Sequence, residues 1–236
     1  MCDQYGTGIY FGERDCSVQR RHQKLIEEAP TIHLDAAGHK AIGEAAVNGA
    51  LSIGYSNAGT MEFLLDEHGK FYFMEMNARI QVEHPVTEAI TGVDLIQQML
   101  LVAAGEPFSF TQADIVPRGH AIECRINAED PDNNFAPAAG RLETFVVPGG
   151  PWTRVDSHCY PGWMVSPHYD SLIAKLIVWA PDRPQAIERM QRALGEFVIS
   201  GPGVKTTIEF HQRVLSNPVF REGDFATDFL ERHMSQ

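Results

Sequence analysis

The segment "TMEFLLDEHGKFYFMEMN", residues 60–77, contains two glutamates that could bind a divalent cation together. Its two apolar runs are joined by a polar turn with Gly69, which predicts a β-hairpin. A four-residue loop at 67–70 would place Glu62 directly opposite Glu75, with Cβ atoms about 4.5–5.5 Å apart. Opposed carboxylates repel each other unless a cation lies between them, and a few hard oxygen ligands suit Mg²⁺. The alternative is that both glutamates lie on a solvated sheet face.

Polar side chains continue beyond this hairpin at strict two-residue spacing, at Glu75, Asn77, Arg79, Gln81 and Glu83. A strand sends alternate side chains to opposite faces, so we expect these residues on one face of an extended strand. Asn77 could supply a third oxygen to the metal. Arg79 would then place a guanidinium beside a magnesium-phosphate site. The pattern predicts a site for an anionic substrate next to a metal ion.

Composition excludes several classes of function. The net charge of −12 and the pI near 5.2 argue against broad nucleic-acid binding. No run of 18 apolar residues predicts a membrane span, and the first twenty residues show no signal-peptide core. The four cysteines form no CxxC pair, which is typical of reduced thiols, so we expect a cytoplasmic protein. The segment 14–24 is basic within this acidic chain and indicates an anionic ligand or partner.

Periodicity predicts the elements that position these residues. We expect helices over 37–53 and within 85–105, the second with Val93, Ile96, Leu100 and Ala103 on one face. Strand-like runs follow at 120–128, 141–147, 153–160 and 171–180. A further helix begins at Asp182, with an apolar stripe of Ala186, Met190, Ala193, Leu194 and Phe197. We place a domain boundary within 108–117. Since the first residues resemble the middle of a hairpin, we expect the chain to be part of a longer polypeptide.

Three motifs resemble one enzyme family, the biotin carboxylases. They are "ERDCSVQRRHQKLIEEAP" from residue 13, "FMEMNARIQVEHPVTE" from residue 73 and "HAIECRINAED" from residue 120. These enzymes are the ATP-grasp components of acetyl-CoA, pyruvate, propionyl-CoA and methylcrotonyl-CoA carboxylases. The resemblance runs from about residue 6 to 232 and covers the C-terminal half of such an enzyme. It implies an α+β fold, with the second half of an ATP-grasp domain at 1–110 and the biotin carboxylase C-terminal domain at 111–236.

The resemblance also implies a reaction and its cofactors. ATP and bicarbonate would form carboxyphosphate, and the carboxyl group would pass to N1 of biotin on a carrier protein, with Mg²⁺ or Mn²⁺ bound. The metal ligands would be Glu62, Glu75 and Asn77. Bicarbonate would contact Lys24, Arg79, Gln81 and the Val82 backbone, with Glu83 as the general base. Arg79 would stabilise the biotin enolate, and Arg125 would contact the biotin ureido oxygen or phosphate. Gln19, His22, Glu62, Leu64 and Met74 would contact the nucleotide.

Other interpretations of single residues stay open at this point. Glu83 could form a salt bridge that orients Arg79 instead of acting as a base. The alternation in 120–127 puts Arg125 on a polar face, where it could pair with Glu123 or Glu129. Neither alternative would give these residues a direct part in the reaction.

The expected partners follow from the resemblance. The carrier would be a separate biotin carboxyl carrier protein acting with a carboxyltransferase component, since the chain has no Met-Lys-Met biotinylation site. A homodimer would form through the C-terminal domain, at Arg154 and the turn 147–152, unless Trp152 packs back into its own domain. We expect no nucleic-acid or membrane partner.

The expected function is the first half-reaction of acetyl-CoA carboxylase, in fatty-acid synthesis. The chain shows no glycine-rich lid over the phosphates, so these residues alone are expected to be inactive. Alternatives are the equivalent module of a pyruvate, propionyl-CoA, methylcrotonyl-CoA or urea carboxylase. An alternative from another class is a non-catalytic assembly domain.

Overall fold

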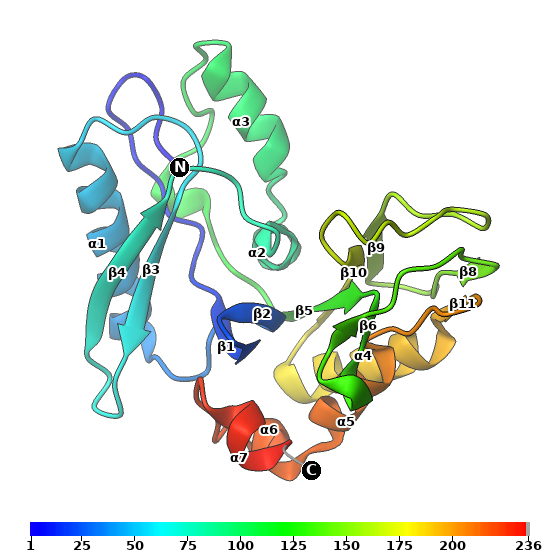
Figure 1. The fold of residues 1–236 in the computed structure, drawn as a ribbon. Coiled ribbons are helices and arrows are strands. Elements are labelled where there is room, and N and C mark those ends of the chain that lie inside the picture. The colour runs from blue at the N-terminus through cyan, green and yellow to red at the C-terminus, as the bar shows by residue number, and fades with distance from the viewer. Residues whose placement is uncertain (235–236) are drawn as a thin grey trace. The chain divides into compact units, whose positions relative to one another are not determined.

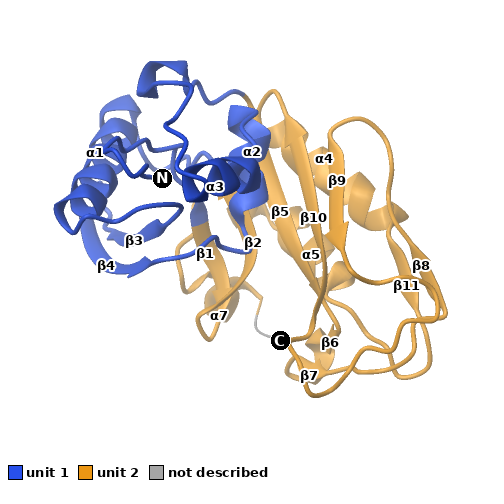
Figure 2. Ribbon diagram, turned by 90° about the horizontal axis from the view of Figure 1, so that it is seen from above, with its two compact units in different colours: residues 1–15, 29–118 blue, residues 16–28, 119–236 orange. Residues whose placement is uncertain are grey.

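The computed structural model describes residues 1–234 and divides into two compact units (Figure 2). Unit 1 comprises residues 1–15 and 29–118, and unit 2 comprises residues 16–28 and 119–236. The sequence suggested one boundary within 108–117. The structure differs because the hairpin of β1 (Asp15–Arg20) and β2 (Gln23–Ala29) adds its strands to the sheet of unit 2. The basic segment 14–24 is therefore divided between the units.

Unit 1 consists of one β-hairpin with helices. Its elements are α1 (Ala36–Ser52), β3 (Thr60–Leu65), β4 (Phe71–Asn77), α2 (His84–Thr91), α3 (Leu95–Ala103) and a 3₁₀ turn at Gln112–Asp114 (Figure 1). The Asp35 side chain caps α1 by accepting a hydrogen bond from the Gly38 N–H. Gly43 lets the Tyr10 ring pack against α1, because a Cβ there would lie 2.4 Å from that ring.

The helical region 85–105 is two helices. Gly92, in the left-handed conformation with φ 73°, ends α2, and Asp94 caps α3 through the Gln97 N–H. The expected apolar face of this segment is wrong. In α3 the buried side chains are Leu95, Gln98 and Val102, while Ile96 and Leu100 are exposed. The break at Gly92 restarts the helical phase, so the periodicity of the whole segment does not hold.

Unit 2 is built on a five-stranded sheet with the order β1-β2-β5-β10-β9, which confirms the expected α+β class. Its central strands β5 (His120–Asn127) and β10 (Leu172–Ala180) pair antiparallel, and β9 (Thr153–Ser157) pairs with β10. The pairs β6 (Glu129–Asp130) with β7 (Ala136–Pro137) and β8 (Thr144–Val146) with β11 (Val198–Ser200) are separate. The remaining elements are a 3₁₀ turn at Pro131–Asn133, α4 (Arg183–Glu196), α5 (Ile208–Ser216), α6 (Pro218–Glu222) and α7 (Phe229–His233).

Helix α4 contributes the apolar stripe that the sequence predicts. Asp182 caps it through the Gln185 N–H, and Pro184 lies in the first turn, where no intrahelical donor is needed. The expected stripe of Ala186, Met190, Ala193, Leu194 and Phe197 is buried in the core of this unit. Within residues 1–234 no single helix is long and apolar enough to cross a membrane; only α2 and α3 together, bent by 99°, pass that test by length and composition.

Candidate functional site

Glu62 and Glu75 form a directly opposed pair across the β3–β4 hairpin, as the sequence predicts. The route to this register is different from the expected one. The last strand pair is Leu65 with Phe71, so the loop has one more residue than expected. A regular ladder from there would set Glu62 opposite Met74. A bulge between Glu62 and Phe63 shifts the register by one residue and brings Glu75 opposite Glu62.

The Asn77 carboxamide lies between these two carboxylates. Its Nδ2 donates to Glu62 Oε1 at 3.2 Å and to Glu75 Oε1 at 2.9 Å, while its Oδ1 accepts from Arg79 at 3.1 Å. The amide N–H groups thus occupy the position between like charges where the sequence predicts a cation. Two carboxylates and one amide oxygen are a hard-oxygen ligand set that fits Mg²⁺. To complete it, Asn77 would have to turn its oxygen toward the carboxylates.

No group of three or more His, Cys, Asp or Glu side chains in the described part of the chain is arranged to hold a metal. The candidate metal site therefore depends on the Asn77 oxygen and on ligands from outside the protein, such as phosphate or water. This composition is typical of Mg²⁺ sites that share the ion with a nucleotide.

The polar row beyond Asn77 does not form as expected. Strand β4 ends at Asn77, and the Arg79 N–H turns back to the Asn77 carbonyl at 2.9 Å. Gln81 and Glu83 are buried and lead into α2, with Glu83 at its N-cap position. The alternation is present in the sequence but does not describe one strand face, because the backbone leaves the extended conformation after Asn77.

The Gln81 side chain nevertheless contacts Glu62, one of the candidate metal ligands. Its Nε2 donates to Glu62 Oε1 at 2.7 Å, so Glu62 Oε1 accepts from Asn77 and Gln81 together. Arg79 is exposed and donates to the Ile80 carbonyl at 3.2 Å as well as to Asn77. The structure thus brings Glu62, Glu75, Asn77, Arg79 and Gln81 into one hydrogen-bonded cluster.

A residue that the sequence analysis did not single out joins this cluster. Arg14 donates to Gln81 Oε1 at 2.9 Å, to Thr60 Oγ1 at 3.0 Å and to Thr87 Oγ1 at 2.9 Å. The basic character of segment 14–24 was the available signal for it. That signal indicated an anionic ligand rather than a structural contact, and it did not distinguish Arg14 from its basic neighbours.

The two apolar residues expected to line the adenine are on the hairpin near the carboxylates. Leu64 and Met74 are each 52% exposed, and Met74 is the additional residue of the bulge. Leu64 lies two residues after Glu62 on β3, so both side chains are directed to the same face of the hairpin. An apolar surface next to a metal site is compatible with a base beside its phosphates.

Arg125 has a carboxylate partner, but not one that the sequence suggested. Its Nε and its terminal nitrogen both approach Glu27 Oε1 at 2.6 Å, and Glu27 is fully buried. The polar residues Glu123 and Asn127, which alternate with apolar ones along β5 as Arg125 does, are buried rather than solvated. The signal that was missed is the acidic pair Glu27–Glu28 inside an apolar run. Two adjacent acids in a buried strand require partners on both of its faces.

The backbone of Arg125 is held from α5. Thr207 Oγ1 donates to the Arg125 carbonyl at 2.9 Å, and His211 Nε2 lies 2.7 Å from the same oxygen. Burial lowers the pKa of His211 from 6.5 to about 4, although the Arg125 carbonyl favours the protonated ring. His211 is therefore neutral at pH 7 and donates to that carbonyl from Nε2.

Glu28, on the opposite side of β2, anchors a second buried cluster. It lies 2.7 Å from His120 Nε2, and Arg183 donates to both of its oxygens at 2.7 and 3.0 Å. Burial disfavours the Glu28 carboxylate, but the hydrogen bonds from His120 and Arg183 outweigh this and lower its pKa. Arg183 also donates to the carbonyls of Phe220 and Arg221, which joins β2, α4 and α6. None of these residues was predicted.

The remaining expected contacts belong to the β1–β2 hairpin of unit 2. Lys24 is half-buried on β2, and Gln19 on β1 has a long 3.5 Å contact to the Cys16 carbonyl. His22 is exposed in the turn, where Arg21 and His22 have φ of 49° and 65°. Two successive left-handed residues are typical of a tight type I′ hairpin. The expected site residues are thus divided between the units: Gln19, His22, Lys24 and Arg125 are in unit 2, the rest in unit 1.

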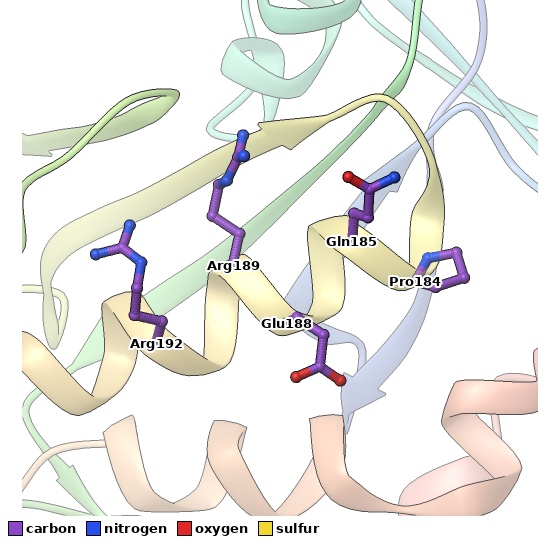
Figure 3. A pocket seen from close by; sticks show the side chains of 5 residues that line it. All are labelled: Pro184, Gln185, Glu188, Arg189 and Arg192. Carbon is purple, nitrogen blue, oxygen red and sulfur yellow. The ribbon is translucent and has the colours of Figure 1, made fainter.

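An open cavity of about 400 Å³ lies on helix α4 and contains none of the expected site residues. It is lined by Pro184, Gln185, Glu188, Arg189 and Arg192 (Figure 3). Arg192 donates to the Gly149 carbonyl at 3.2 Å, in the turn expected to form a dimer contact. In that turn Trp152 packs 4.9 Å from Trp179, ring centre to ring centre, yet stays 62% exposed. Part of its ring surface is therefore available to a partner.

Two family models match the chain. The carbamoyl-phosphate synthase L chain ATP binding domain matches residues 1–111, and the biotin carboxylase C-terminal domain matches residues 123–232. Among curated proteins, the Nostoc sp. biotin carboxylase is 57% identical over 98% of this chain and 51% of its own length. The chloroplastic biotin carboxylase of Arabidopsis thaliana is 56% identical over 99% and 43%. A pyruvate carboxylase subunit from Methanothermobacter thermautotrophicus is 54% identical over 99% and 47%.

Two solved structures also resemble the chain. The biotin carboxylase domain dimer of Hydrogenobacter thermophilus 2-oxoglutarate carboxylase, in complex with MgADP, ADP and bicarbonate, matches with TM-score 0.97 and 51% identity. That match covers 99% of this chain and 51% of the other. A complete pyruvate carboxylase from Rhizobium etli matches with TM-score 0.94 and 39% identity, over 98% and 23%. The chain spans about half the length of the curated biotin carboxylase from Nostoc sp..

Proposed function

Because the chain belongs to the biotin carboxylase family, we propose that it supplies the metal and bicarbonate part of a site that carboxylates biotin with ATP and bicarbonate. The observation that carries this proposal is the hydrogen-bonded cluster of Glu62, Glu75, Asn77, Arg79 and Gln81. The complete enzyme would be this chain together with the part of its relatives' length that it does not span. The Hydrogenobacter domain bound to MgADP and bicarbonate supports the ligand set.

Glu62, Glu75 and Asn77 would hold Mg²⁺ or Mn²⁺. When bound, the ion would neutralise negative charge on the phosphates of ATP. The protein prepares the position by opposing two carboxylates whose repulsion a cation removes. Asn77 would exchange its present hydrogen bonds to the carboxylates for an oxygen directed at the metal. This rotation of the Asn77 amide would also break the hydrogen bond that Asn77 Oδ1 accepts from Arg79.

Bicarbonate would bind beside the metal in unit 1. Arg79, Gln81 and the Val82 backbone would hold its oxygens, since a guanidinium and an amide N–H are suited to a planar anion. Glu83 would take the bicarbonate proton, and its burial at the start of α2 supports a role away from bulk water. Lys24 and Arg125 would contribute positive charge toward bicarbonate, biotin and phosphate oxygens.

Four further residues would contact the nucleotide. Leu64 and Met74 would contact adenine, and Gln19 and His22 would contact the nucleotide from the β1–β2 hairpin. We also propose a separate biotin carboxyl carrier protein and a carboxyltransferase component as partners, and a cytoplasmic location. The exposed face of Trp152 and the dimeric Hydrogenobacter domain support a homodimer through the C-terminal domain.

The test is ADP release by the complete enzyme with ATP, Mg²⁺, bicarbonate and free biotin. We expect release that requires both bicarbonate and biotin, together with formation of carboxybiotin. ADP release that ignores bicarbonate would contradict the proposal and would favour a different ATP-dependent reaction.

Acetyl-CoA is the final acceptor that we propose for the parent enzyme, in fatty-acid synthesis. Pyruvate is the second candidate, supported by the 54% identity to the Methanothermobacter pyruvate carboxylase. Carboxyl transfer from the carboxylated carrier to acetyl-CoA or to pyruvate, measured with each carboxyltransferase component, distinguishes the two.

A further inference from the structure

We infer that Arg14 is a positioning residue that fixes the orientation of the Gln81 carboxamide and so prepares Gln81 to bind bicarbonate. The role assigned to Gln81 rests on the proposed function, whereas the contact between the two side chains is independent of it. Arg14 donates to Gln81 Oε1 at 2.9 Å. A guanidinium can only donate, so it selects the amide orientation that presents the oxygen of Gln81 to it.

The selected orientation determines what Gln81 offers to the site. With its oxygen held by Arg14, Gln81 directs its NH₂ group away from Arg14, and Nε2 donates to Glu62 at 2.7 Å. Glu62 is the one acceptor of Nε2 among residues 1–234, so the second amide hydrogen is available to a ligand oxygen. A carboxamide turned the other way would present its oxygen to Glu62 and repel an anion.

Arg14 also joins the segments that carry the other site residues. Its two further acceptors are Thr60 and Thr87, at 3.0 and 2.9 Å. Thr60 is paired with Asn77 across the hairpin, and Thr87 lies one turn after Glu83 in α2. One guanidinium therefore fixes β3, the segment after β4 and the first turn of α2 relative to one another.

The charge of Arg14 supports the same role. In the described chain its hydrogen-bond acceptors are two hydroxyls and one amide oxygen, and its buried Nε has no acceptor. No carboxylate therefore neutralises this cation directly. Its positive charge at Gln81 opposes the repulsion that the Glu62 carboxylate would exert on a bicarbonate anion, and the low polarity of a half-buried position strengthens this effect.

The first experiment detects positioning without any activity. In the 236-residue chain, the side-chain amide signals of Gln81 are assigned in a ¹H–¹⁵N spectrum by their loss in Gln81→Met. Arg14→Lys keeps the positive charge but loses the planar guanidinium that donates from two nitrogens. We expect this variant to shift the Gln81 amide signals and to speed their hydrogen exchange. The Gln112 amide, held by the backbone of Tyr10, serves as an internal control and should not move. Unmoved Gln81 signals would overturn the inference.

The second experiment measures the consequence in the complete enzyme. We expect Arg14→Lys and Arg14→Met to raise the KM for bicarbonate about tenfold, the scale of one hydrogen bond to a charged group. The KM for ATP should stay within about twofold. Loss of folding would lower the amount of active enzyme and leave both KM values unchanged, so a rise in the KM for bicarbonate alone separates the two explanations. Since Arg14→Met could fail to fold, Thr87→Val removes one acceptor of Arg14 and should raise the KM for bicarbonate about threefold.

The matched control is Thr91→Val, on the same helix. The Thr91 hydroxyl donates to the Thr87 carbonyl and not to Arg14, so the KM for bicarbonate should not change. An active wild-type enzyme whose KM for bicarbonate is unaffected by Arg14→Lys would contradict the inference and leave the proposed function standing. If the wild-type enzyme shows no bicarbonate-dependent turnover, the proposed function fails, and the Gln81 amide signals alone decide whether Arg14 positions Gln81.

Discussion

Glu62 lies directly opposite Glu75 because the bulge at Met74 offsets a loop that is one residue longer than a regular register would need. The two changes cancel at this pair. Bulges are typical of places where a strand must redirect a functional side chain. Here the result is an opposed carboxylate pair that Asn77 bridges through its amide nitrogen.

Arg79→Ala should abolish biotin carboxylation by the complete enzyme while leaving the affinity for ATP largely intact. Arg79 is exposed, and its contacts are to the Asn77 oxygen and the Ile80 carbonyl, so its removal should leave the hairpin folded. The measurement is the rate of carboxybiotin formation together with the Kd for ATP. A wild-type rate in Arg79→Ala would refute the assignment of Arg79 to the bicarbonate and biotin site.

His211→Gln should make the stability of the chain less sensitive to acid. Because the pKa of His211 is lowered from 6.5 to about 4, the unfolded state takes up the proton first as pH falls. Wild-type stability is thus fully present above pH 6.5 and is lost as the pH falls toward 4. Between pH 7 and pH 5 this group should cost about 2 kcal/mol of unfolding free energy.

Glutamine keeps a donor for the Arg125 carbonyl and cannot be protonated in this range, so it isolates the effect. The check is urea unfolding of wild type and His211→Gln at both pH values. An equal loss of stability in the two proteins would show that His211 is not the neutral buried group described.

Arg154→Glu should dissociate the dimer of the complete enzyme. Arg154 donates from two nitrogens to Asp156, each at 2.8 Å, and lies two residues after the exposed Trp152 in the sequence. A glutamate there would set like charges side by side on the expected contact surface. Sedimentation velocity gives the result, with Arg213→Glu as a control on an exposed pair with Asp132. A dimer that survives Arg154→Glu would place the interface elsewhere.

The 236 residues alone should fold and release no ADP above background with ATP, bicarbonate and biotin. Phosphoryl transfer needs charge neutralisation around the whole triphosphate, and this chain offers two carboxylates and an amide for the metal. The isolated chain should also self-associate through the exposed apolar side chains of β3 and β4, including Leu64 and Phe73. Turnover of about 1 per second or faster would mean that these residues contain a complete site.

The sequence predicted those parts of the structure that depend on local patterns. Helix α1 and the cap and stripe of α4 follow from periodicity and capping residues. The Glu62–Glu75 pair was predicted from a regular four-residue loop, but it forms through a longer loop and a bulge that the sequence did not predict. What it could not predict depends on pairing between distant segments. Arg125 pairs with Glu27, which is 98 residues away in the sequence. Strand β2 lies beside β5 in the sheet, although the long segment of unit 1 that ends at Arg118 separates the two strands in the sequence.

The site residues show the same division. The two-residue spacing identified Gln81 and Glu83 as candidate site residues. Their positions, however, are determined by their burial and by the start of helix α2. Arg14 could be recognised only as part of a basic segment, since its acceptors Thr60 and Thr87 have no charge that would mark them in the sequence.

Binding of Mn²⁺ to the 236-residue chain tests the central claim most directly, because it needs neither ATP nor the rest of the enzyme. Free Mn²⁺ is measured by electron paramagnetic resonance for wild type and for Glu62→Gln/Glu75→Gln. The control, Glu67→Gln/Glu106→Gln, removes the same charge from exposed positions of the same unit. We predict one saturable site, weakened at least about tenfold in the first variant by the loss of both carboxylate ligands and unchanged in the control. Equal Mn²⁺ affinity in all three proteins would contradict the assignment of Glu62 and Glu75 as metal ligands.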